Sequence, residues 1–165
     1  MKKILFLSTG GTFNKHYSEA TGAIAIDTQA KTLHELAEKW RAHFEIRTLI
    51  GKDSLDMDAE DRALLLQEII QSGYEDIIVI HGTDTMDLSA AYIAQAALQK
   101  RIIFTGAMVP YRVDRVEATA NVAMAYGYLQ ADIPDGVYIS MNGVIGEYRE
   151  IYKERSLGRF VRRAR

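Results

Sequence analysis

Three short segments rich in hydroxyl and glycine residues carry the groups in this sequence that could perform chemistry. They are residues 8–12 (Ser-Thr-Gly-Gly-Thr), 81–85 (His-Gly-Thr-Asp-Thr) and 105–108 (Thr-Gly-Ala-Met), and each follows a run of apolar residues. Glycines let a backbone approach a ligand closely, and free N–H groups at the start of a following helix suit a carboxylate or an oxyanion. The segments therefore predict a site for a small ligand of that kind.

A threonine hydroxyl needs a base before it can act as a nucleophile at neutral pH. A lysine can serve where burial or a neighbouring charge lowers its pKa, and a carboxylate can orient it. Thr12, Thr83 and Asp84 would form such a set with a lysine that spacing alone does not choose. The plainer alternative is that Asp84 and Thr85 cap a helix. That alternative is favoured for any one segment alone, whereas three segments together favour a site.

Several other classes of site are excluded or disfavoured. Cysteine is absent, which removes disulfides, thiolate metal ligands and cysteine nucleophiles. The first segment lacks the spacing of a dinucleotide fingerprint, and no Gly-Lys-Ser/Thr phosphate loop exists. His34 and His43 have no carboxylates at ligand spacing, so no metal site is expected. His81 is interpreted as a packing or hydrogen-bonding residue of its own segment.

Apolar runs that alternate with amphipathic stretches must position these segments. Strands alternating with helices indicate a parallel sheet covered on both faces, with right-handed crossovers, and ligands bind beyond the carboxyl ends of such strands. Asp58 is predicted to cap one helix, which ends at Ser72-Gly73. The remaining predictions are strands over 4–7, 44–50, 77–80, 101–104 and 136–140, shorter extended pieces over 23–26 and 144–147, and helices over 32–42, 88–98 and 116–129.

Size and charge fit one compact domain. The chain has 165 residues, of which 48% are apolar, and 20 Lys and Arg oppose 22 Asp and Glu, for a net charge of −2. The protein therefore has no overall positive charge that would attract nucleic acid or an anionic membrane. The apolar stretch after Met1-Lys2-Lys3 is too short for a signal peptide and no run reaches a membrane span, so a cytoplasmic location is expected. The arginine-rich segment 149–165 is interpreted as a solvated tail or an interface arm.

The motifs at 9–12, 81–86 and 104–108, in this order, resemble those of the bacterial-type L-asparaginase family. The resemblance covers nearly the whole chain and corresponds to the N-terminal domain of the usual enzyme. We therefore expect one domain over residues 1–165, a short form without the family's C-terminal domain. The resemblance implies a flavodoxin-like, three-layer α/β/α fold with a mostly parallel sheet. It also implies hydrolysis of L-asparagine to L-aspartate and ammonia through a threonine acyl-enzyme, without a metal or organic cofactor.

The same resemblance assigns the catalytic residues. Thr12 matches the primary nucleophile, and Thr83 and Asp84 match the family's second cluster. The lysine of that cluster, counted by the family's interval from Met141-Asn142, is Lys153. Tyr17 matches a tyrosine on a mobile loop that activates the nucleophile. The loop over 13–22 is accordingly expected to be mobile without ligand and ordered with it.

A further loop, residues 53–57, resembles the part of the family that binds the substrate's carboxylate. Ser54 matches the serine that contacts the α-carboxylate, whereas Leu55 stands where many members have a glutamine that touches the α-amino group. This departure leaves glutamine, D-asparagine or a peptide amide open as substrates, and a retired amino-acid-binding module is the alternative to an enzyme. The expected substrate-binding residues are Gly11, Asp53, Ser54, Gly82, Thr83 and Asp84.

Partner subunits complete the active site in the full-length family, through the partner's C-terminal domain. A chain of this length would complete the site differently or leave it more open, and fewer substrate contacts would raise KM. A homodimer or higher homo-oligomer is expected. Neither nucleic acid nor a membrane is expected as a partner.

Overall fold

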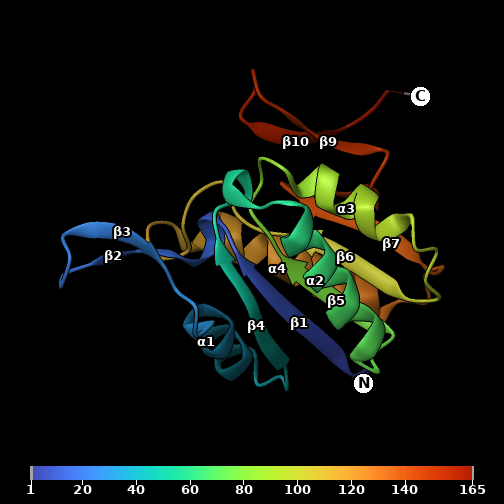
Figure 1. Ribbon diagram of the computed structural model, residues 1–165, viewed down its shortest axis with the longest axis horizontal. Coiled ribbons are helices and arrows are strands. Elements are labelled where there is room, and N and C mark those ends of the chain that lie inside the picture. Colours follow the sequence, from blue (N-terminus) through green and yellow to red (C-terminus); the bar gives the residue numbers. More distant parts are fainter. Residues whose placement is uncertain (1, 165) are drawn as a thin grey trace.

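The computed structural model describes residues 2–164 and has a six-stranded sheet at its centre, in the order β4-β1-β5-β6-β7-β8 (Figure 1). The first five of these strands are parallel, and β8 runs antiparallel to β7. Numbered along the chain, the parallel strands lie in the order 2-1-3-4-5, which is the flavodoxin-like order. The predicted fold is confirmed. The strands are β1 (Ile4–Gly10), β4 (Glu45–Lys52), β5 (Asp76–Ile80), β6 (Arg101–Thr105), β7 (Gly136–Met141) and β8 (Val144–Glu147).

Helices cover both faces of the sheet and make three layers. Phe6 and Ile78 belong to a core cluster shared with α1 and α4, whereas Leu5 and Ile77 belong to a second cluster shared with α2 and α3. All four side chains are fully buried. The central strands read as unbroken apolar runs because both of their faces are covered. The helices are α1 (Lys31–Trp40), α2 (Ala59–Gln71), α3 (Met86–Ala94) and α4 (Arg115–Gln130).

Local sequence explains where several elements begin and end. Asp58 caps α2 as predicted, since its side chain accepts from the Glu60 and Asp61 N–H groups while Asp61 reaches back to the Asp58 N–H. Asn142 and Gly143 join β7 to β8 with φ angles of 50° and 82°. A two-residue turn with two positive φ angles matches the twist of a hairpin. No helix among residues 2–164 is long and apolar enough to cross a membrane.

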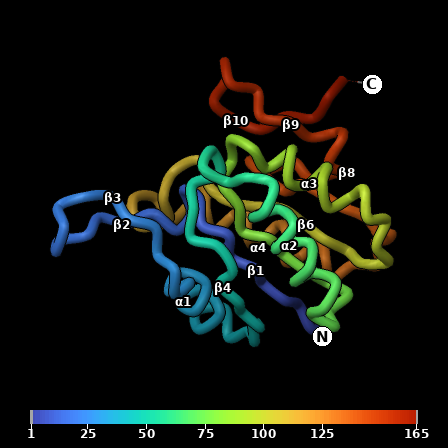
Figure 2. Tube along the Cα trace, in the orientation of Figure 1, coloured from blue at the N-terminus to red at the C-terminus, as the bar shows by residue number. Residues whose placement is uncertain are grey.

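Two small hairpins lie outside the main sheet. One pairs β2 (Lys15–Ser18) with β3 (Ala23–Ile26) and projects from the body, and the other pairs β9 (Ile151–Glu154) with β10 (Arg159–Arg162) beside α3 (Figures 1 and 2). Only β3 was predicted, because residues 15–18 carry no apolar alternation.

The interpretation of residues 149–165 as a solvated tail is wrong. Ile151 and Phe160 are 1% and 2% exposed and belong to the second core cluster. The Phe160 N–H also donates to Asn142 Oδ1 at 2.9 Å. Two buried apolar residues among many cations produce too weak a pattern to reveal this hairpin. Met1 and Arg165, the ends of the predicted domain, lie outside the described residues.

Candidate active site

The loops over residues 9–12, 53–57 and 81–85, which carry predicted substrate-binding residues, converge where β1 and β5 end. These neighbouring strands connect to β4 and β6 on opposite sides, which makes their carboxyl ends the topological switch point of the sheet. Gly11 has a φ of 74°, and a Cβ atom there would lie 2.5 Å from Gly82 Cα. A Cβ atom on Gly82 would lie 2.6 Å from Ser54 Oγ. Glycine is therefore required at both positions, and it lets the loops that carry Thr12, Ser54 and Thr83 touch.

Ser54 presents a buried hydroxyl to this meeting point. The residue is 1% exposed, and its Oγ atom makes no hydrogen bond within residues 2–164. Its carbonyl oxygen accepts from Thr85 Oγ1 at 2.8 Å, which fastens the loop of Ser54 to the loop of Thr83. A buried hydroxyl gains stability from a partner. Ser54 Oγ therefore retains its capacity to donate and accept a hydrogen bond at the point where the three loops meet.

Lys153 reaches across from β9 and joins Thr83 to Asp84. Its Nζ atom donates to Thr83 Oγ1 at 2.9 Å and to Asp84 Oδ1 at 2.8 Å, and its side chain is 16% exposed. Since an ammonium only donates, Thr83 accepts from it and keeps its own hydrogen for another acceptor. The structure therefore brings together the three residues of the predicted second cluster.

The alternative in which the side chains of Asp84 and Thr85 cap α3 is wrong. Thr85 is the N-cap residue of α3, but its side chain makes no capping hydrogen bond and donates to the Ser54 carbonyl oxygen. Asp84 Oδ1 accepts from Lys153 and also from Arg155, whose Nη1 lies 3.0 Å away. The Thr85 hydroxyl and the Asp84 carboxylate therefore form hydrogen bonds to other segments of the chain and do not cap the helix.

Arg155 is a contact that the sequence did not predict. Its second guanidinium nitrogen donates to the Asp84 carbonyl oxygen at 3.3 Å. The hydrogen bond from Lys153, followed by the charges of Lys153 and Arg155, holds the pKa of Asp84 below its usual range. The available signal was spacing, because alternate residues along an extended strand share a face and Arg155 follows Lys153 by two.

Asp53 is held in an ion pair at the edge of the same region. Its Oδ2 atom lies 2.6 Å from Lys15 Nζ, and its Oδ1 accepts from the Leu55 N–H at 3.3 Å. The hydrogen bond from Lys15 lowers the pKa of the Asp53 carboxyl. This carboxylate both caps the short turn η2 (Ser54–Asp56) and ties down the first residue of β2. Lys15 was not identified from the sequence.

His81 supports the loop of Thr83 from below. It is fully buried, with Nδ1 2.7 Å from the Gly82 carbonyl oxygen and Nε2 2.8 Å from Ser89 Oγ. A carbonyl can only accept, so Nδ1 carries the proton and Nε2 accepts from the Ser89 hydroxyl, which itself accepts from Arg62 Nε at 3.1 Å. Burial lowers the pKa of His81 to about 4, which keeps the ring neutral.

The third motif, residues 105–108, supports the site and does not present its hydroxyl to the crevice. Thr105 is fully buried, and its Oγ1 donates to the Ser140 carbonyl oxygen at 2.8 Å. A Cβ atom on Gly106 would lie 2.3 Å from the His81 carbonyl oxygen. This motif therefore packs beneath the loop of His81, and its prediction as a ligand-binding segment is not supported by these contacts.

Thr12 and Tyr17 lie differently with respect to the crevice. Thr12 begins the turn η1 (Thr12–Asn14) directly after Gly11, and Asn14 Nδ2 braces that turn by donating to the Gly10 carbonyl oxygen at 2.8 Å. Tyr17 is 63% exposed on the β2–β3 hairpin. Among residues 2–164, no hydrogen bond joins Tyr17 to Thr12.

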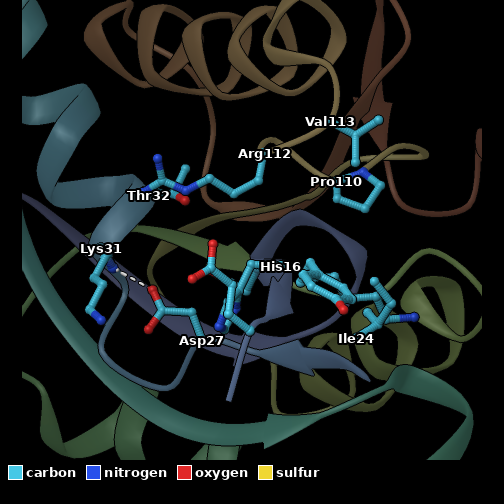
Figure 3. A pocket seen from close by; sticks show the side chains of 12 residues that line it. His16, Ile24, Asp27, Lys31, Thr32, Pro110, Arg112 and Val113 are labelled. Carbon is cyan, nitrogen blue, oxygen red and sulfur yellow. Dashed lines mark hydrogen bonds between the residues drawn. The ribbon is translucent and has the colours of Figure 1, made fainter. Parts of the chain in front are cut away.

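Tyr17 instead lines a separate cavity of about 460 Å³ between the hairpin, the start of α1 and the loop over 110–113 (Figure 3). His16 and Ile24 line the hairpin side, and Pro110 and Val113 lie opposite them. Thr12, Thr83, Asp84 and Lys153 are not among its lining residues. The structure thus brings the loops of Thr12, Ser54 and Thr83 together and joins Lys153 to Thr83 and Asp84, whereas Tyr17 lines another part of the surface.

Comparison with known proteins identifies the family of this chain. The family model for the asparaginase N-terminal domain matches residues 3–159. A glutamyl-tRNA(Gln) amidotransferase subunit from Methanococcus vannielii is 30% identical over 157 residues, which cover 89% of this chain and 36% of that protein. The corresponding protein of Methanococcus maripaludis is also 30% identical, over 156 residues, with the same coverage. The chain spans about a third of the length of these curated relatives.

Solved structures of L-asparaginases have the same fold. The thermostable L-asparaginase from Thermococcus kodakarensis superposes with a TM-score of 0.82 at 26% identity, over 97% of this chain and 51% of that one. A probable cytoplasmic L-asparaginase from Campylobacter jejuni gives the same TM-score at 24% identity, over 97% and 53% of the two chains, and supports the fold alone. The match to the family model over nearly the whole chain shows that this protein belongs to the asparaginase family, whose N-terminal domain it matches.

Proposed function

We propose that this chain is an amidohydrolase that converts a side-chain carboxamide and water to a carboxylate and ammonia. L-Asparagine is the substrate proposed from family membership. The observation that carries the proposal is the bridge from Lys153 to Thr83 and Asp84, beside the point where the loops of Thr12 and Ser54 meet. A lysine, two hydroxyls and a carboxylate at one crevice are the groups that covalent amide hydrolysis requires.

In the first half-reaction, Thr12 Oγ attacks the amide carbonyl carbon. The hydroxyl proton passes through a base to the amide nitrogen, the C–N bond breaks, and ammonia leaves an ester on Thr12. Tyr17 is proposed as the base. Because Tyr17 lies on the projecting hairpin, this role requires the hairpin to close over the crevice, which would also exclude bulk water.

In the second half-reaction, water attacks the ester carbonyl and the bond to Thr12 Oγ breaks. The Thr83 hydroxyl accepts the water's proton and gives its own hydrogen to Thr12 Oγ, while the hydrogen bond from the Lys153 ammonium holds Thr83 Oγ1 in place. The Thr83 N–H is proposed to stabilise the oxyanion of both tetrahedral intermediates.

Substrate binding is proposed to use the groups around the glycine contacts. The buried Ser54 hydroxyl would bind the α-carboxylate, with the Gly11 and Gly82 backbones against the substrate. Asp84 would offer charge to an α-ammonium, and Asp53 would position the loop that holds Ser54.

The direct test is coupled ammonia release from L-asparagine and L-glutamine by the wild type and by Thr12→Ala. We expect turnover with at least about 10³-fold loss in the variant, because the nucleophile is removed. Thr48→Ala, which truncates an exposed threonine on β4, should retain full activity. Intact-mass analysis of quenched reactions should find the acyl group on Thr12. Folded wild type that releases ammonia from neither amide would overturn L-asparagine as the substrate, and full activity in Thr12→Ala would overturn the proposed mechanism.

A second candidate concerns what becomes of the ammonia. The curated relatives are named as subunits of an amidotransferase. Ammonia released here could therefore be passed to a partner protein, in place of the homo-oligomer expected from L-asparaginases. Light scattering on the purified chain tests this, since a stable homodimer supports the self-contained enzyme and a monomer favours the partner. A cytoplasmic location remains our proposal.

A further inference from the structure

Arg155 shares with Lys153 one oxygen of the carboxylate proposed to receive a substrate's ammonium group, and the other oxygen, Oδ2, accepts no hydrogen bond within residues 2–164. Asp84 Oδ1 accepts from Lys153 Nζ at 2.8 Å and from Arg155 Nη1 at 3.0 Å. The guanidinium is fixed at a second point, because its Nη2 donates to the Asp84 carbonyl oxygen. One negative charge therefore already faces two positive charges on a single oxygen.

We infer that Arg155 is a specificity-determining residue that shifts the site toward carboxamides bearing a carboxylate but no free α-ammonium. The inference rests on the proposed amidohydrolase function and names the substrate class for the same site. An α-ammonium bound at Asp84 would be a third cation on one carboxylate, beside Lys153 and Arg155. A methylene or an N-acyl group in its place carries no charge and meets no such repulsion.

The other carboxylate of the substrate loops is also already paired. Asp53 Oδ2 lies 2.6 Å from Lys15 Nζ, and both side chains are about a quarter exposed. An ammonium that approached Asp53 would have to displace Lys15. Asp53 and Asp84 are therefore both paired with a cation already. The buried Ser54 Oγ, in contrast, has no hydrogen-bond partner within residues 2–164.

Leu55 removes a further means of holding an ammonium. It follows Ser54 on the loop that packs against Gly82, and its side chain is 69% exposed. An apolar side chain offers no hydrogen-bond acceptor, but it can pack against a methylene or an acyl group. The charge at Asp84 and the side chain at position 55 thus favour the same class of substrate.

Arg155 can be altered without damage to the core. Its side chain is 68% exposed and lies at the outer side of the Asp84 pair. Arg159, on β10 of the same hairpin, is exposed and forms no ion pair within residues 2–164. Arg155→Gln and Arg159→Gln therefore remove the same charge from one hairpin, and only the first affects Asp84.

The experiment compares kcat and KM for ammonia release from succinamate, N-acetyl-L-asparagine and L-asparagine at low ionic strength. The wild type should prefer succinamate or N-acetyl-L-asparagine to L-asparagine. A preference for succinamate indicates a substrate without an amino group, and a preference for N-acetyl-L-asparagine indicates an acylated one. Arg155→Gln should raise the ratio of kcat/KM for L-asparagine to kcat/KM for succinamate about 5-fold, because an exposed ion pair contributes little free energy. The change should come from a lower KM for L-asparagine. Arg155→Lys should restore part of the discrimination, and Arg159→Gln should leave the ratio unchanged.

Binding of the products gives a readout that does not depend on turnover. Calorimetry should show that wild type binds succinate more tightly than L-aspartate and that Arg155→Gln narrows the difference. Tighter binding of L-aspartate by wild type, or an unchanged ratio in Arg155→Gln, would overturn the inference. Absence of ammonia release from every amide would instead count against the proposed function, and the calorimetric comparison would still decide the role of Arg155.

Discussion

Two hairpins outside the main sheet each carry a residue predicted to act in catalysis, and they hold it in opposite ways. The β9–β10 hairpin is anchored by Ile151 and Phe160, which are 1% and 2% exposed, and it delivers Lys153 to Thr83. The β2–β3 hairpin carries Tyr17, which is 63% exposed, and projects from the body (Figure 1). A catalytic side chain is positioned by the buried residues at the base of its element, so the first hairpin is a fixed support, whereas the second has no such buried anchor and is proposed to move.

The attachments at the base of the β2–β3 hairpin support this contrast. The Asp27 N–H donates to the Asn14 carbonyl oxygen at 2.9 Å, and Lys15 pairs with Asp53. These contacts close the hairpin's neck and leave its outer part without buried apolar anchors. A moving element held only at its neck is what the proposed closure of Tyr17 requires.

Loss of Lys153 should have the largest effect. Lys153→Met keeps the length of the side chain and removes the donor to Thr83 and Asp84, so kcat should fall about 10²- to 10⁴-fold. Ammonia release under saturating substrate measures this. The control, Lys31→Met at the start of α1, should retain wild-type kcat. Full activity in Lys153→Met would show that the fixed hairpin has no catalytic role.

Truncating one apolar side chain in each hairpin should have very different effects on the free energy of unfolding. Phe160→Ala deletes a fully buried ring from the second core cluster and should lower the free energy of unfolding by about 3–5 kcal/mol. Ile24→Ala, at a side chain that is 64% exposed, should change it by less than about 0.5 kcal/mol. Urea unfolding measures both values, and similar losses in the two variants would contradict the contrast.

The loop to which Lys153 is joined should be sensitive to acid through His81. Its folded pKa of about 4 lies below the unfolded value of 6.5, so the unfolded state binds the proton first. Stability from this group is complete above pH 6.5 and declines as the pH falls toward 4, by up to about 3 kcal/mol. Urea midpoints between pH 7 and pH 4.5 should show the decline. His81→Gln should flatten it, whereas His43→Gln, at an exposed ring, should not.

The hairpins also show what the sequence could predict. All six strands of the main sheet and all four helices were predicted, because burial on two faces gives unbroken apolar runs and Asp58 is a specific capping signal. The β9–β10 hairpin was missed because its stability comes from two long-range contacts, at Ile151 and Phe160, within a basic segment. Such contacts join residues far apart in the sequence, so the local pattern of apolar and polar residues does not predict them.

The candidate site divides in the same way. The crevice could be predicted from topology, since loops at the carboxyl ends of parallel strands must meet. Lys153 was placed by the family's spacing. Arg155 and Lys15 are ion-pair partners from other elements, and only the folded chain shows that they face Asp84 and Asp53.

The smallest expected effect concerns the proposed closure of the β2–β3 hairpin. Its tip contains Glu19, an exposed residue at which a glutamate-specific protease can cut when the hairpin is open. A ligand that binds the closed form, at ten times its dissociation constant, should lower the open fraction and hence the cutting rate about 10-fold. Succinate and L-aspartate are the ligands to compare, with the cleavage products identified by mass spectrometry. Cleavage near Glu154, on the fixed hairpin, is the internal reference and should be slow with or without ligand, because Ile151 and Phe160 hold that strand in the core. Equal cutting at Glu19 under all conditions would mean that the hairpin does not close over the crevice, and Tyr17 would then lose its proposed role as the base for Thr12.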